Sequence, residues 1–174
     1  MLLFYLIVLR FVHVIASVCW AGGAFIFFLF VEPTAKALAP TGMEFVQHMV
    51  VKRRYSIFMS VASTLTVLTG ALLLWQDASG QWLAWMRTGP GLGFTLGSAV
   101  GIVVYMVGMF GVRPRADRLG IISQEIQLAG GPPTPAQGAE LQKIDKEMLT
   151  LGYIDFVLVA LSLALMATAR YWLF

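Results

Sequence analysis

The sequence predicts an all-α, polytopic membrane protein: an antiparallel bundle of four transmembrane helices that forms one membrane domain over residues 1–174. Hydrophobic residues make up 59% of the chain and charged residues only 12%, whereas about one-quarter of the residues of a soluble domain are charged. Four apolar segments are long enough to cross a hydrocarbon core of about 30 Å. They lie at about residues 3–31, 55–76, 92–112 and 149–172.

The first apolar segment, residues 3–31, differs from a secretory signal peptide. A signal peptide has a basic N-terminal region and an apolar region of about 7–15 residues, followed by a small-residue cleavage site. This segment is much longer, lacks the basic region, and ends at Glu32-Pro33 without such a site. We therefore expect a retained transmembrane helix.

The connection between the first two spans, residues 32–54, is expected to carry a helix of its own. The stretch TGMEFVQHMVVKRRYS begins with a candidate helix cap and becomes a basic, amphipathic approach to the second span, which suits an anionic membrane surface. The second span, residues 55–76, has hydroxyl groups that are expected to bond to carbonyls of their own helix. Its small and polar face consists of Ser56, Ser60, Ser63 and Gly70.

The third span, residues 92–112, carries the clearest packing signal. Gly93, Gly97 and Gly101 recur at a spacing of four residues, so they share one helix face. Small residues of this kind let helices approach closely in lipid, where apolar area does not drive association. The glycine face is predicted to contact a neighbouring helix, and a homodimer or a larger membrane complex formed through it is an open alternative.

A helical hairpin is predicted between the third and fourth spans. Residues 113–148 form helical extensions of both spans, with a Gly-Pro break at residues 130–135. The second arm continues into the fourth span, residues 149–172. Apolar residues at helical spacing on the two arms are expected to face each other: Leu119, Ile122 and Ile126 on one arm, and Leu141, Ile144 and Met148 on the other.

Basic residues predict the orientation of the bundle. Nine of the twelve Lys and Arg residues lie in the connections 32–54 and 113–148, and Arg87 alone lies in the connection 77–91. The positive-inside rule therefore places the hairpin on the cytoplasmic side and both termini on the periplasmic or outer side. The basic residues are not interleaved with aromatic ones, so the predicted partner is the lipid bilayer and no nucleic acid. Aromatic residues expected at the outer interface are Trp75, Trp82, Trp85 and Trp172.

Polar residues follow one side of the first span: Arg10, His13 and Ser17, with Trp20 at the margin. A charged arginine inside the membrane costs at least about 2.5–3.5 kcal/mol, so Arg10 is expected to face the bundle interior or to reach back to the outer surface. His13 has two interpretations. It either forms a hydrogen bond with another helix, or it ligates a metal or haem iron, because a neutral imidazole offers a lone pair.

If His13 ligates haem iron, Arg10 suits a haem propionate, and a second axial ligand must be found. The only other histidine, His48, lies in the cytoplasmic connection. The helix from residue 13 to residue 31 alone rises about 27 Å, so His48 is too distant and is predicted to be a surface residue. Met166, in the outer half of the fourth span, is the candidate soft ligand.

Asp155 is the second charge predicted at membrane depth. One interpretation is structural, with Asp155 paired to Lys52, Arg53 or Arg54. The other is functional, with Asp155 in a proton path that includes Tyr105 and Tyr153.

Two segments resemble a known group of small bacterial membrane proteins. LRFVHVIASVCWAGGAFIFFLFVEP and RRYSIFMSVASTLTVLTGALLLW resemble the first and second helices of the CopD-type copper-resistance family and, more distantly, of the HemJ-type protoporphyrinogen oxidases. The likeness is closest to uncharacterised four-helix relatives of these families. It implies a four-helix fold in the bacterial inner membrane, and it implies that His13 corresponds to the haem-associated histidine of the first helix.

The leading hypothesis is a protein that binds haem b and transfers electrons in the inner membrane, with quinone or a redox protein as partner. His13 would be the axial metal ligand, Arg10 the propionate partner, Met166 the opposite ligand, and Ser17 and Trp20 the pocket wall. The reaction class would be oxidoreduction, although catalysis itself is left open. Hydrolytic chemistry is excluded, because the sequence has no phosphate-binding glycine loop, nucleophile motif or HExxH pair.

Two alternatives belong to other classes of protein. The first is a permease-like bundle that handles copper or a small solute, in which Arg10, His13 and Asp155 mark the pathway. The second is a non-catalytic accessory subunit that docks onto a larger membrane complex through the glycine face of the third span.

Overall fold

The computed structural model describes residues 1–174 and contains only helices. Four helices are long and apolar enough to cross a membrane, at Leu2–Ala37, Tyr55–Ala78, Gly89–Ala129 and Pro135–Tyr171. The four predicted spans are therefore confirmed, and three of their helices extend well beyond the apolar segments. The elements are α1 (Leu2–Ile26), η1 (Phe27–Val31), α2 (Glu32–Ala37), α3 (Thr41–Val51), α4 (Tyr55–Ala78), α5 (Trp82–Met86), α6 (Gly89–Met106), η2 (Val107–Val112), α7 (Arg113–Ala129), α8 (Pro135–Thr168) and η3 (Ala169–Tyr171).

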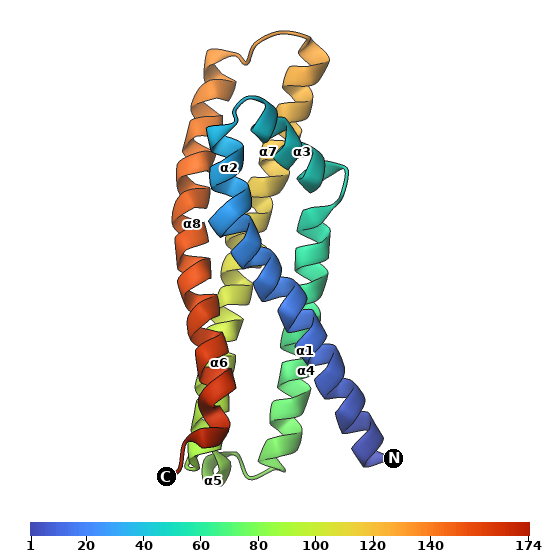
Figure 1. Ribbon diagram of the computed structural model, residues 1–174, viewed down its shortest axis with the longest axis vertical. Helices are drawn as coiled ribbons and strands as arrows, with labels where there is room; N and C mark the ends of the chain where they lie inside the picture. The colour runs from blue at the N-terminus through green and yellow to red at the C-terminus, as the bar shows by residue number, and fades with distance from the viewer.

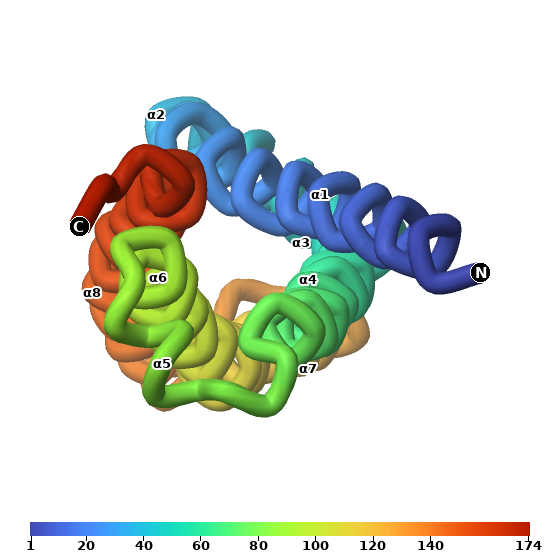
Figure 2. Tube along the Cα trace, turned by 90° about the horizontal axis from the view of Figure 1, so that it is seen from below, coloured from blue at the N-terminus to red at the C-terminus, as the bar shows by residue number.

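The long helices α1, α4, α6 and α8 surround a common axis (Figures 1 and 2). The closest pairs are α1 with α4 and α6 with α8, α4 also contacts α6, and contacts between α1 and α8 are few. Both termini and α5 lie at one end of the bundle, which we call the termini end (Figure 1). The connection formed by α2 and α3 and the turn between α7 and α8 lie at the other, which we call the hairpin end.

Two widened helical turns lie towards the hairpin end. Each is a π-helical segment, η1 and η2, and each is followed by a proline, Pro33 or Pro114. Proline has no N–H, and its ring clashes with the carbonyl four residues before it, so the ordinary α-helical ladder cannot run through these positions. The sequence analysis ends the first span at residue 31, whereas the helix passes through the widened turn and continues to Ala37.

The glycine face of α6 packs against α8 of the same chain. A Cβ atom added to Gly93 would meet Ala169, and one added to Gly97 would meet the side chain of Met166. The hydroxyl of Ser162 also donates a hydrogen bond of 2.9 Å to the carbonyl of Gly97. The prediction of close packing is confirmed. Within the chain, the helix that covers this face at Gly97 is α8.

The predicted helical hairpin is confirmed. Gly130 ends α7 with a positive φ of 65°, and Thr134 begins α8 with a capping box. Ile122 on α7 and Ile144 on α8 are both buried. Arg115 donates to Glu147, and Arg118 donates to Glu140, each at 2.7 Å.

The connection at residues 32–54 carries helix, as predicted, and α3 lies against α7. Lys36 joins this connection to α8, because its Nζ lies 3.0 Å from Glu32 and 2.9 Å from Asp145. At the termini end, aromatic rings pair across the loops. Trp75 packs on Trp82 with ring centroids 5.7 Å apart, and Trp85 stacks on Phe94 at 6.5 Å.

Candidate functional site

A cavity of about 610 Å³ lies among α1, α4, α6 and α8, and we call it the central cavity. Its wall is mostly aliphatic and aromatic. Polar side chains in the wall are few, and they come from all four helices: His13, Ser17, Thr66, Ser98 and Ser162. A large apolar space with a few polar groups is the usual form of a site for a small molecule or a cofactor.

His13 is held in one orientation by α4. Its Nδ1 lies 3.0 Å from the carbonyl oxygen of Thr66 and 3.1 Å from the hydroxyl oxygen of Thr69. A carbonyl oxygen only accepts hydrogen bonds, so Nδ1 must carry the proton. The hydroxyl of Thr69 donates to the carbonyl of Leu65 at 2.6 Å, so its oxygen is also an acceptor for His13.

These bonds leave the other ring nitrogen of His13 unprotonated in the neutral form. Nε2 makes no hydrogen bond with the protein, and the side chain lines the central cavity. A histidine that ligates a metal usually donates its other ring N–H to a carbonyl or carboxylate, which fixes its tautomer and orientation. The arrangement around His13 has this form.

Gly70 makes room for the imidazole. A Cβ atom at Gly70 would lie 2.9 Å from Cε1 of His13 and 3.4 Å from Nδ1. Gly70 and the threonines that hold the ring, Thr66 and Thr69, all belong to α4. Gly70 belongs to the small and polar face predicted for this helix, and that prediction did not include either threonine. Residues three or four apart share a helix face, so the spacing of Thr66 from Ser63 and Gly70 was the sequence signal that could have identified it.

Three other predicted site residues line the same cavity as His13. They are Ser17, Trp20 and Met166. The Ser17 hydroxyl donates to the carbonyl of His13 at 2.7 Å, so it also braces the local helix. The structure therefore brings four of the five predicted cofactor-binding residues to one space.

Arg10 is the fifth, and it does not line the central cavity. Its guanidinium lies 3.7 Å from the carboxylate of Asp77 near the end of α4, and 49% of its side chain is exposed. Of the two positions predicted for Arg10, the structure has the one outside the interior: the side chain reaches towards the termini end, where Asp77 supplies a partner. His48 is exposed on α3, in agreement with its predicted surface position.

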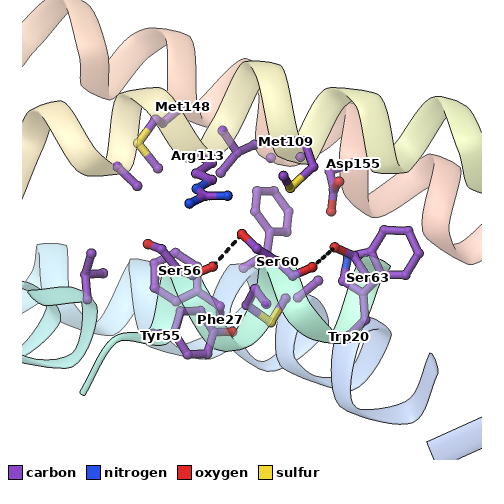
Figure 3. A pocket seen from close by; sticks show the side chains of 18 of the residues that line it. Trp20, Phe27, Tyr55, Ser56, Ser60, Ser63, Met109, Arg113, Met148 and Asp155 are labelled. Carbon is purple, nitrogen blue, oxygen red and sulfur yellow. Dashed lines mark hydrogen bonds between the residues drawn. The ribbon is translucent and has the colours of Figure 1, made fainter. Parts of the chain in front are cut away.

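A second cavity, of about 160 Å³, lies nearer the hairpin end, and we call it the hairpin cavity. Charged side chains in its wall are Glu32, Arg113 and Asp155, and Ser56, Ser60 and Ser63 line one side (Figure 3). Trp20 lines both cavities and is thus a shared wall. The widened turns η1 and η2 supply Phe27, Phe28, Gly108, Met109 and Val112 to the hairpin cavity.

Asp155 points into the hairpin cavity (Figure 3). The structure contains no ion pair between Asp155 and Lys52, Arg53 or Arg54.

The two tyrosines grouped with Asp155 in the sequence analysis lie elsewhere. The hydroxyl of Tyr105 lies 3.3 Å from that of Thr64 and joins α6 to α4. Tyr153 is 58% exposed and packs edge-on against Phe28. Neither tyrosine lines the hairpin cavity.

No group of three or more His, Cys, Asp or Glu side chains converges in a way that would hold a metal ion. The donors that the central cavity offers to a metal are instead the imidazole of His13 and the thioether of Met166. No protein-family model, curated protein or solved structure matches the chain.

Proposed function

We propose that the protein binds haem b in the central cavity and transfers electrons in the bacterial inner membrane, from a quinol-type reductant to an acceptor on the outer side. The observation that carries this proposal is the state of His13. Its Nδ1–H is engaged by α4, and its Nε2 is free to ligate iron. When bound, haem would supply one-electron chemistry, and the protein would supply ligation, orientation and an apolar surrounding.

The central cavity suits such a group in size and polarity. Its volume of about 610 Å³ falls in the usual range of about 300–1,000 Å³ for small-molecule sites. Met166 lines the same space, and its thioether would be a second group able to hold the iron. A propionate contact from Arg10 would require Arg10 to exchange its partner Asp77. That pair is half-exposed and 3.7 Å long, so it is weak.

The distribution of charge supports an orientation with the hairpin end in the cytoplasm. Nine of the twelve basic residues belong to the connections at that end, as the positive-inside rule requires. Four of the five tryptophans, Trp75, Trp82, Trp85 and Trp172, belong to segments at the termini end. In this orientation His13 lies in the outer half of the membrane. The resemblance of the first two helices to CopD-type and HemJ-type proteins supports the bacterial inner membrane.

A permease-like protein for copper or a small solute is the second candidate. The observation that favours it is that ionisable side chains occur at three levels along the bundle axis. From the termini end they are the Arg10–Asp77 pair, then His13, then Asp155. Trp20 lines both cavities, so its side chain alone stands between the level of His13 and the level of Asp155. Such intramembrane ionisable residues commonly mark a pathway.

The test is an absorption spectrum of the detergent-purified protein from haem-replete cells, oxidised and then reduced with dithionite. We expect a haem spectrum in the wild-type protein that is lost in His13→Ala and retained in His48→Ala, which removes the only other histidine. Met166→Leu should alter the spectrum without abolishing binding. Absence of a Soret band in the wild-type protein refutes the proposal and favours the second candidate. An unchanged spectrum in His13→Ala refutes the role of His13 in holding the haem.

A further inference from the structure

We infer that Asp155 is a proton-binding carboxyl group that exchanges protons with water at the hairpin end and takes up a proton when negative charge enters the central cavity. The side chain lines the hairpin cavity and has no ion-pair partner. An unpaired carboxylate at membrane depth is costly, whereas the protonated form carries no charge. A group in this position is suited to change its protonation state rather than to hold two helices together.

The hairpin cavity extends from Asp155 to two charged side chains that are partly exposed. Arg113 lines the cavity, and 41% of its side chain is exposed. Glu32 lines it as well and is 19% exposed. These two residues therefore mark the mouth of the cavity, and Asp155 lies further in, beside Ser60 and Ser63 (Figure 3).

The serines give the cavity a polar side. The Ser60 hydroxyl donates to the carbonyl of Ser56 at 2.8 Å, and the Ser63 hydroxyl donates to the carbonyl of Ser60 at 3.1 Å. Their hydrogens are thus engaged, but their oxygen lone pairs can accept hydrogen bonds from water. Water held there can carry a proton between the mouth and the carboxylate of Asp155.

The other titratable or charged groups of the cavity are already engaged. Glu32 from α2 pairs with Lys36 at 3.0 Å, and Arg113 from α7 lies 3.8 Å from Asp117. From α4, the Tyr55 hydroxyl donates to the carbonyl of Gly23 at 2.9 Å. The wall residues contributed by α1, α3, η1 and η2 carry no charge. Asp155 of α8 is therefore the one acid of this cavity that is left to bind a proton.

Trp20 places this acid next to the proposed redox site, because its side chain separates the two cavities. Charges interact strongly across an interior of low dielectric constant. An electron donated by the quinol-type reductant adds one negative charge to the central cavity, and one proton from water binds the Asp155 carboxylate in compensation. When the electron leaves, the proton returns to water. This coupling between proton uptake by Asp155 and entry of an electron into the central cavity rests on the proposed function. Proton binding by Asp155 does not.

Labelling with dicyclohexylcarbodiimide tests proton binding without any cofactor. A protonated carboxyl in an apolar site adds its O–H across one C=N bond of this reagent, and the adduct rearranges to a stable N-acylurea. We expect mass spectrometry to find the adduct on Asp155, with a yield that falls as the pH rises. Asp155→Asn should abolish it, Asp155→Glu should restore it, and Asp145, which pairs with Lys36, should remain unlabelled. No adduct on Asp155 at any pH overturns the inference.

A redox titration of the haem-loaded protein as a function of pH tests the coupling. One proton per electron lowers the midpoint potential by about 59 mV for each tenfold fall in proton concentration. We expect a pH-dependent potential in the wild-type protein and in Asp145→Asn, and a flat one in Asp155→Asn. An unchanged slope in Asp155→Asn overturns the coupling. If no haem spectrum exists, the proposed function and the coupling both fail, while the labelling still decides whether Asp155 binds a proton.

Discussion

Gly70→Ala should disturb the seat of His13 while leaving the rest of the cavity intact. The new methyl group would lie 2.9 Å from Cε1 of His13, inside the usual carbon contact distance of about 3.5–4.0 Å. The ring must move, which lengthens the bonds from Nδ1 to Thr66 and Thr69. Overpacking costs about 1–3 kcal/mol and a lost hydrogen bond about 0.5–1.5, while alanine regains about 1 in helix propensity. We expect a net loss of about 1–3 kcal/mol.

The matched control for this substitution is Gly22→Ala. Gly22 lines the same cavity, but a Cβ atom there would meet nothing within 4 Å. The free energy of unfolding would be measured for both variants by titration with a denaturing detergent, followed by circular dichroism. Haem content per protein would be measured in parallel. Gly70→Ala should lose stability and haem, and Gly22→Ala should lose neither. Equal behaviour of the two variants would falsify the reasoning about the His13 seat.

Two further predictions concern packing and charge. Gly93→Ala would bring a methyl group 2.8 Å from Cβ of Ala169 and 2.9 Å from its Cα, so α6 and η3 must separate at a cost of about 1–3 kcal/mol. The same detergent titration should show no loss for Gly138→Ala, where the space is open. A stable Gly93→Ala would contradict the close approach. Arg10→Gln should cost less than about 1 kcal/mol, because its pair with Asp77 is exposed and long, and a larger loss in that titration would mean that Arg10 has a buried partner.

The transmembrane spans were predictable because each is a long, uninterrupted apolar segment, and hydropathy reports this directly. The hairpin was predictable for a similar reason: Gly130 and Thr134 are turn and cap residues between two arms with matching apolar positions. The glycine face of α6 predicted close packing, but its partner was left open. Spacing along one helix identifies a face and carries no information on which helix covers it.

The candidate site was predictable only in part. His13, Ser17 and Trp20 share a face of one helix, so their common cavity follows from helical periodicity. Arg10 belongs to the same face, yet the structure pairs it with Asp77. That pairing depends on how α1 crosses α4, which no pattern within a single span contains. Thr66 and Thr69 could have been placed on the polar face of α4 from their spacing, but their hydrogen bonds to His13 also depend on that crossing.

The widened turns η1 and η2 have a consequence for comparison with related chains. A π-helical turn is equivalent to an α-helix with one inserted residue, and one residue corresponds to about 100° of rotation. Each of these segments therefore sets the angular phase between a membrane helix and its extension at the hairpin end. A relative lacking one residue in either segment would keep the same hydropathy profile, but its α2 or α7 would present a different face to the neighbouring helices. Insertion or deletion of one residue near Pro33 or Pro114 would therefore change the packing at the hairpin end more than most substitutions would.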